Sequence, residues 1–252
     1  MLNIELLLQR DRLIVAGGLV ALTILAWTYT YGLVGGAWPS LMAMPQRGGW
    51  TSLDLALTML MWMVMMIAMM TPSVAPMILL VATIERRRGQ ASPAECAAFA
   101  LCGYFGIWAV ASVLAAAAQW TLHDAALLNG PMGRLSPQIA GILLIGVGAY
   151  QWTPMKAACL GFCRSPLNSI ADYWRPGPLG ALRLGLRHGL YCLGCCWALM
   201  AALLVTGIMN LVWVALLSAL VLTEKLLPRG LWLGRIAGLG LFAWGLVLTI
   251  AA

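Results

Sequence analysis

From Gly189 to Thr223 the chain reads GLYCLGCCWALMAALLVTGIMNLVWVALLSALVLT, 35 residues without a charged side chain. At about 1.5 Å per residue, a single helix of this length would extend about 50 Å, whereas the hydrocarbon core of a bilayer is about 30 Å thick. Gly207 and Asn210 lie near the middle of the run and favour a tight turn. The stretch is therefore either one long helix or two membrane helices joined by a hairpin.

The composition of the whole chain agrees with a membrane protein. Of its 252 residues, 62% are hydrophobic and only 9% are charged, whereas soluble domains contain roughly 25% charged residues. We predict an all-α, polytopic bundle in which residues 1–252 form a single integral membrane domain. The predicted spans lie near residues 13–34, 55–80, 97–122, 136–154, 189–207, 210–224 and 234–251. The net charge of +7 comes from Lys and Arg in short loops, which favours contact with the lipid bilayer over nucleic acid.

The distribution of these charges decides between the hairpin and the long helix. With a hairpin, only Arg47 and Arg134 of the 15 Lys and Arg residues fall on one side of the membrane. Without it, the three basic residues between 225 and 235 move to that side and the asymmetry weakens. Because positive residues concentrate in cytoplasmic loops, we predict seven spans, with the N-terminus cytoplasmic and the C-terminus external.

Five of the seven cysteines form a pattern typical of a metal or redox site. On a helix, offsets of three and four residues align side chains, so His188, Cys192, Cys195 and Cys196 share one face. The pair Cys159 and Cys163, also four residues apart, follows the fourth span onto the same cytoplasmic surface. The cytosol is reducing, so these thiols are expected to be free. Cys96 and Cys102 are expected to be ordinary core residues.

Two pairs of thiols from neighbouring helix ends can surround one soft ion, and copper(I), zinc and iron–sulfur clusters all suit such donors. We predict that four thiols bind one cation, with His188 or Cys196 as an alternate fourth ligand. Lys156 and Arg164 are expected to offset the thiolate charge. The predicted metal-site residues are Cys159, Cys163, His188, Cys192, Cys195 and Cys196.

The second span carries methionines at helical spacing, and two more lie in the external loop before it. Thioethers are soft ligands, so such a ladder can pass copper(I) from one sulfur to the next. Methionine is also an adaptable core residue, and the stripe has that simpler interpretation as well. The candidate metal path consists of Met42, Met44, Met59, Met63, Met66 and Met70.

Polar features of the spans point away from an acid–base enzyme. Pro72 and Pro76 free backbone carbonyls within the second span, which is consistent either with a substrate site or with a simple kink. Glu224 and Lys225 are expected at the cytoplasmic surface, and no acidic residue is expected in mid-membrane. No hydrolase, phosphate-binding or zinc-protease motif is present. We therefore predict no catalytic residues and favour a protein that is not an enzyme.

Several motifs together resemble a bacterial family described as predicted metal-binding integral membrane proteins. The resemblance runs from about the second span to the sixth. It rests on Trp62-Met-Val-Met-Met-Ile-Ala-Met-Met-Thr-Pro72, on Tyr150-Gln-Trp-Thr-Pro154 with Cys163-Arg-Ser-Pro166, and on Gly189-Leu-Tyr-Cys192-Leu-Gly-Cys195-Cys196-Trp197. The resemblance implies metal binding in the bacterial cytoplasmic (inner) membrane. The family often has a histidine where this chain has Phe162, so His188 or another group must replace that ligand.

Three functions are compatible with these residues. The first is a membrane protein that handles copper(I) or zinc in transport or in loading another metalloprotein, with a metal-donor protein as partner. The second is an accessory subunit of a larger membrane complex, in which the cysteines form a structural clip. The third is a thiol oxidoreductase in which Cys192 and Cys195 exchange electrons with a quinone or with partner thiols.

Overall fold

The structure is a computed structural model that describes residues 2–34, 51–88, 92–129, 134–165, 173–208 and 210–251, with the side chains of the first range described for residues 13–32. Met42 and Met44, the first two residues of the candidate metal path, lie outside these ranges. Helices account for almost all of the described chain, together with one antiparallel ladder that pairs Leu128 with Leu135. The all-helical class expected from the sequence is confirmed.

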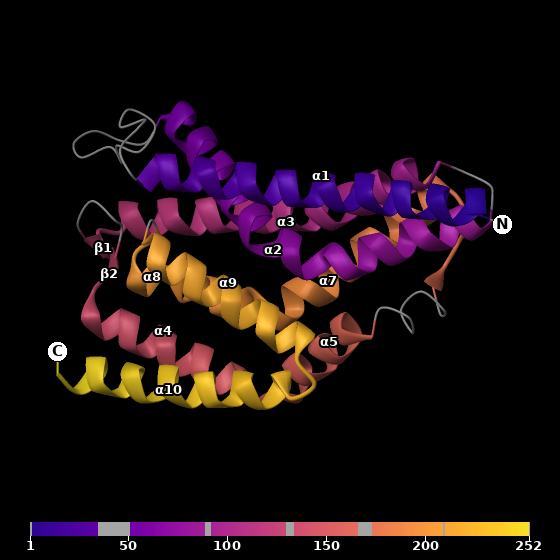
Figure 1. Ribbon diagram of the computed structural model, residues 1–252. Coiled ribbons are helices and arrows are strands. Elements are labelled where there is room, and N and C mark those ends of the chain that lie inside the picture. Colours follow the sequence, from indigo (N-terminus) through magenta and orange to yellow (C-terminus); the bar gives the residue numbers. More distant parts are fainter. Residues whose placement is uncertain are drawn as a thin grey trace.

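The helices run along one common direction, with the marked N- and C-terminal ends at opposite ends of the bundle (Figure 1). Helix α5 lies in the half of the bundle toward the N-terminus (Figure 1), and we call this side the thiol end because the candidate cysteines gather there. The elements are α1 (Leu2–Val34), α2 (Ser52–Arg88), α3 (Pro93–Asp124), β1 (Leu128–Asn129), β2 (Arg134–Leu135), α4 (Pro137–Tyr150), α5 (Pro154–Arg164), α7 (Pro178–Ala201), α8 (Leu203–Thr206), α9 (Leu211–Leu226) and α10 (Gly230–Ile250).

Five helical segments of the described chain are long and apolar enough to cross a membrane. They are Leu13–Gly32, Ser52–Arg88, Pro93–Asp124, Pro178–Thr206 and Gly230–Ile250. Helix α4 is apolar but shorter, with 14 residues, and α9 has 16. These lengths and compositions are compatible with a membrane location.

The uncharged run at 189–223 is divided into separate helices, not folded as one. Helix α8 ends at Thr206, and Gly207 has a φ of 97°, in the left-handed region that side chains with a Cβ rarely adopt. The side chain of Asn210 then accepts a hydrogen bond of 3.4 Å from the backbone N–H of Trp213, which caps the start of α9. The glycine and the cap together explain why the helix breaks here.

Helix α7 begins earlier than the sequence suggested. The predicted span begins near residue 189, but residues 179–187 form the first turns of α7, which starts at Pro178. Proline is favoured in a first turn because it has no backbone N–H to satisfy. A Cβ at Gly185 would lie only 2.0 Å from the carbonyl oxygen of Ala100. The small residue therefore lets α7 pack directly against α3, as small residues do in membrane bundles.

Helices α4 and α10 form a second close pair along the edge of the bundle (Figure 1). A Cβ at Gly148 would lie 2.6 Å from the carbonyl oxygen of Gly238, so backbone packs against backbone here too. The bundle thus has two tightly packed pairs, α3 with α7 and α4 with α10. Helix α9 lies between them and contacts both α10 and α2.

Candidate metal centre

Helix α5 carries two of the candidate ligands and packs against α7. It starts after a short break from α4, where the Thr153 hydroxyl accepts a hydrogen bond of 3.3 Å from the backbone N–H of Lys156. Pro154 occupies the first turn, so α5 begins as a capped helix. The sulfur of Cys159 lies so close to α7 that a Cβ at Gly194 would be 2.7 Å from it. One turn later, the Cys163 thiol hydrogen-bonds to Cys195.

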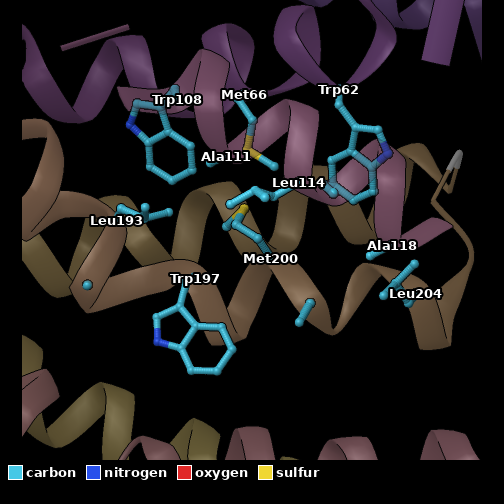
Figure 2. A pocket seen from close by; sticks show the side chains of 13 residues that line it. Trp62, Met66, Trp108, Ala111, Leu114, Ala118, Leu193, Trp197, Met200 and Leu204 are labelled. Carbon is cyan, nitrogen blue, oxygen red and sulfur yellow. The ribbon is translucent and has the colours of Figure 1, made fainter. Parts of the chain in front are cut away.

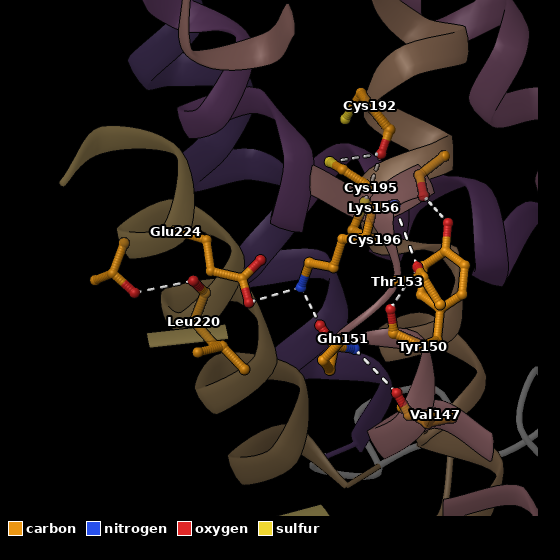
Figure 3. A network of polar contacts seen from close by, with 12 residues as sticks. Val147, Tyr150, Gln151, Thr153, Lys156, Cys192, Cys195, Cys196, Leu220 and Glu224 are labelled. Carbon is orange, nitrogen blue, oxygen red and sulfur yellow. Dashed lines mark hydrogen bonds and ion pairs between the residues drawn. The ribbon is translucent and has the colours of Figure 1, made fainter. Parts of the chain in front are cut away.

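The four candidate ligands of α7 lie on one buried face, as the spacing predicted. His188 is 2% exposed, and Cys192, Cys195 and Cys196 are at most 1% exposed. The thiols of Cys195 and Cys196 donate to the backbone carbonyl of Cys192, at 3.1 and 2.9 Å. Figure 3 shows these cysteines stacked along the helix. The structure thereby brings α5 and α7 thiols together at one end of the bundle.

The Cys192 sulfur has two polar partners from other helices. The Tyr104 hydroxyl of α3 lies 3.0 Å away, and the ammonium of Lys225 on α9 lies 2.9 Å away. Lys225 also donates to the Ser73 hydroxyl of α2 at 3.0 Å. Lys225, predicted to close the sixth span at the cytoplasmic surface, is only 7% exposed and lies inside the bundle. An isolated ammonium is costly to bury, so α9 places it where a thiolate can balance its charge.

Lys156 does not offset thiolate charge as predicted, because it is paired elsewhere. Its ammonium lies 2.8 Å from a carboxylate oxygen of Glu224, and both side chains are at most 1% exposed. It also donates to the side chain of Gln151, whose amide in turn donates to the carbonyl of Val147 at 3.3 Å (Figure 3). Glu224, expected at the surface, is therefore buried, and this network joins α9, α5 and α4.

The pKa values of both α5 thiols are raised above the ordinary thiol value. The pKa of Cys163 is raised well above its ordinary value because its thiol donates to Cys195 and because the side chain is buried. Burial also raises the pKa of Cys159. An incoming cation would therefore have to displace the thiol protons, and only a strongly thiophilic ion such as copper(I) or zinc does so readily.

The cysteines of the described chain are all free. Within the described ranges, no three His, Cys, Asp or Glu side chains converge in a geometry that would hold a metal ion. The thiols instead contact one another and the backbone in pairs. Away from this cluster, Cys96 is buried as expected, but Cys102 is exposed and does not belong to the core.

The methionine stripe runs inside the bundle on α2. Met66 and Met70 are buried, whereas Met59 and Met63 are partly exposed. The Met70 sulfur lies 4.0 Å from the hydroxyl of Ser73, one turn closer to the thiol end. The stripe therefore reaches the serine that hydrogen-bonds to Lys225.

Side chains of neighbouring helices donate hydrogen bonds to backbone carbonyls at the proline break in α2. Pro72 removes the backbone donor that would have bonded to Ala68, and the indole of Trp27 on α1 donates to that carbonyl at 3.0 Å. The Ser218 hydroxyl of α9 donates to the carbonyl of Met69 at 3.4 Å. The carbonyl that Pro72 frees is thus satisfied by packing, which favours a structural kink over a substrate site at that position.

An apolar cavity of about 490 Å³ lies beside the stripe, between α2, α3 and α7. Figure 2 shows the side chains of Met66 and Met200 directed into it, with Trp62, Trp108 and Trp197 around them. Gly194 also lines this cavity, and a Cβ on this residue would lie 2.7 Å from the Cys159 sulfur. The cavity therefore reaches the part of α7 against which Cys159 packs.

The chain matches a protein family described as PpoB2, copper chaperone, over residues 59–248. Because the match covers most of the chain, the protein belongs to this family. No curated protein and no solved structure matches it. Family membership gives the chain a copper-related role, in agreement with the metal-binding family that its motifs resemble.

Sequence reasoning missed the two partners of the Cys192 thiol, Tyr104 and Lys225, and it missed Ser73, which hydrogen-bonds to Lys225. Tyr104 and Ser73 carry no signal in the sequence, because each is one polar residue in an apolar helix. Lys225 did carry a signal, since it adjoins Glu224 at the end of an apolar run. The two opposite charges were expected at the cytoplasmic surface, and the structure pairs each of them with a different helix.

Proposed function

We propose that this protein is a copper(I) chaperone of the bacterial cytoplasmic membrane, which holds the ion at its thiol end and passes it to a client metalloprotein. The proposed ligands are Cys159, Cys163, Cys192 and Cys195, with His188 or Cys196 as an alternate fourth. Copper is favoured over zinc by the family and by the methionine stripe, because thioethers suit copper(I) and are not ordinary zinc ligands.

The observation that carries this proposal is the contact between the thiols of α5 and α7. Cys163 hydrogen-bonds to Cys195, and Cys159 lies against Gly194, one residue before Cys195. Soft thiolate ligands of this kind are the donors that copper(I) prefers. A chaperone must also release its ion, and an incompletely enclosed site permits transfer to a partner.

The proposed arrangement has seven helices across the bilayer, with the thiol end in the cytoplasm. The five long helices supply five spans, and α4 and α9 supply two. At about 1.5 Å per residue these two are about 21 and 24 Å long, and a bilayer tolerates such a mismatch at modest cost. The one-sided distribution of Lys and Arg supports this orientation.

The orientation is testable through the turn between α8 and α9. A cysteine introduced as Asn210→Cys is expected to react with a membrane-impermeant thiol reagent added to intact cells. The same substitution in a variant without Cys102, the exposed native cysteine, controls for background labelling. Reaction only after permeabilisation would place the turn in the cytoplasm and refute seven spans.

We propose that the methionine stripe conducts copper toward the thiol end. Changing Met59, Met63, Met66 and Met70 to Leu preserves the volume of the core approximately. Copper acquired by whole cells is expected to fall, while copper bound by the purified protein in solution is expected to change less. If the copper content of the cells did not change, the stripe would have a packing role only.

Elemental analysis of the purified protein tests the metal site directly. The reduced protein is expected to contain copper, and the triple change of Cys192, Cys195 and Cys196 to Ser is expected to lose it. Cys102→Ser, an exposed cysteine away from the cluster, is the matched control and should retain full copper content. Equal copper content in the triple variant and in the Cys102→Ser control would refute the proposal.

The thiol oxidoreductase is the second candidate, because Cys192 lies beside a buried ammonium that stabilises a thiolate. It requires a reversible disulfide between Cys192 and Cys195. Alkylation of the protein isolated under oxidising and reducing conditions, followed by mass spectrometry, separates the two functions. A cycling disulfide without bound copper would favour the oxidoreductase.

A further inference from the structure

A second, smaller cavity of about 170 Å³ lies at the thiol end, where α2, α5, α7 and α9 meet. It contains three soft or borderline donors, and none of the described residues that line it is a carboxylate. Hard cations such as calcium and magnesium require oxygen ligands and are poorly served here. The cavity is lined by Ser73, Pro76, Met77, Cys163, Arg164, His188, Lys225 and Leu226.

His188 supplies the first indication that this cavity binds a ligand. Its ring is 2% exposed, and its Nδ1 atom is buried without a hydrogen-bond partner among the described residues. An unsatisfied buried polar atom costs about 1–3 kcal/mol, so such atoms are rare in native structures. A neutral imidazole nitrogen is also a common metal ligand.

Met77 supplies the second indication, because it continues the methionine stripe into the cavity. It follows Met70 by seven residues, two helical turns, and therefore lies on the same face of α2. Between them is Ser73, which lies within 4.0 Å of the Met70 sulfur and also lines the cavity. The stripe thus ends at a thioether that shares a cavity with Cys163 and His188.

We propose that the Met77 sulfur, the Cys163 sulfur and the His188 Nδ1 atom form a receiving site for copper(I), through which the ion reaches the thiols. This inference rests on the proposed function and adds Met77 to it. Copper(I) replaces the Cys163 proton, which is released to water, so the ion and the thiolate together are neutral. Because Cys163 also contacts Cys195, it connects the receiving site with the cysteines of α7.

Two basic residues border the cavity, and both are engaged elsewhere. Lys225 is held by the Cys192 sulfur and by Ser73. The guanidinium of Arg164 donates to the carbonyl of Pro228 at 2.6 Å. Neither contact uses the three proposed donors. The positive border disfavours divalent ions more than a single copper(I) ion whose charge is cancelled by a thiolate.

The test compares Met77→Leu with Met69→Leu in the full-length protein in detergent. Both methionines are buried in α2, at 2% and 1% exposure, but Met69 lines neither of the two cavities described. Copper(I) is titrated under anaerobic, reducing conditions against a competing copper(I) chelator. Loss of the Met77 ligand is expected to weaken binding by about tenfold or more, since even second-shell changes cost about 10–100-fold. His188→Gln is expected to weaken binding as well.

A spectroscopic readout shows whether Met77 touches the ion. In protein labelled with selenomethionine, X-ray absorption at the selenium edge should detect a copper neighbour, and Met77→Leu should remove it while Met69→Leu should not. If Met77→Leu binds as Met69→Leu does and keeps the copper–selenium signal, the receiving site is refuted and the chaperone proposal stands. If the unaltered protein binds no copper, the chaperone proposal itself fails.

Discussion

Two lysines are buried at the thiol end, and they differ in what balances their charge. Lys156 faces the Glu224 carboxylate at 2.8 Å, and the Gln151 side chain completes its contacts. Lys225 faces the Cys192 sulfur at 2.9 Å, with the Ser73 hydroxyl as its other partner. Glu224 and Lys225 are consecutive in sequence, so one turn of α9 serves both arrangements.

The difference separates a structural ion pair, Lys156 with Glu224, from a pair whose anion can exchange a proton for a metal ion, Lys225 with Cys192. A carboxylate remains an anion whether or not copper is present, so the Lys156 pair joins α5, α4 and α9 permanently. A thiol can release its proton to a metal or regain it, so the partner of Lys225 changes its charge with its ligand. Changes at Lys156 should therefore affect stability, and changes around Cys192 should affect copper.

The largest effect is expected from Glu224→Gln. Removing one charge of a buried pair leaves the other uncompensated and typically costs about 3–5 kcal/mol. We expect the free energy of unfolding in mixed micelles to fall by about this amount, with unchanged copper per folded molecule. The paired change of Lys156→Met with Glu224→Leu should recover most of the loss. If Glu224→Gln lost its copper but kept its free energy of unfolding, the roles assigned to the two lysines would be reversed.

The next largest effect on stability is expected from Gly234→Ala, which disturbs the Lys156–Glu224 pair sterically. The added Cβ would lie 2.5 Å from a Glu224 carboxylate oxygen and 3.2 Å from the Lys156 ammonium. Overpacking of this kind costs about 1–3 kcal/mol. Gly240→Ala on the same helix is the matched control, since nothing lies within 4 Å of its Cβ. Equal thermal stability of the two variants would show that the pair can move freely.

A smaller effect on stability is expected from Tyr104→Phe. This change removes the hydroxyl that lies 3.0 Å from the Cys192 sulfur and keeps the fully buried ring. One hydrogen bond contributes about 0.5–1.5 kcal/mol. We expect a loss of stability in that range together with altered copper affinity in chelator competition. A stability loss without any change in copper affinity would make Tyr104 a packing residue only.

The smallest effect on stability is expected from Gly194→Ala. Its Cβ would lie 2.7 Å from the Cys159 sulfur, the free end of a side chain that can rotate away. The stability cost should therefore be well below the about 1–3 kcal/mol expected of Gly234→Ala. Copper affinity should nevertheless fall, because Cys159 is displaced from α7. Gly161→Ala on α5, with open space around its Cβ, is the control.

The sequence by itself determined the helical class of the protein and which residues of α7 share one face. Low charge and long apolar runs predict a helical membrane bundle wherever they occur, because the backbone must satisfy its own hydrogen bonds in lipid. Local spacing likewise predicted that His188, Cys192, Cys195 and Cys196 share a face. The break between α8 and α9 could also be predicted from the sequence, since Gly207 and the capping residue Asn210 are local signals.

Only the tertiary structure decided which charges meet which partners. Glu224 and Lys225 are adjacent in the chain, but consecutive residues on a helix point in directions about 100° apart. One therefore reaches α5 and the other reaches α7 and α2, and no sequence pattern shows which. The cavity that brings Met77 to Cys163 and His188 has the same origin, because three separate helices supply its donors.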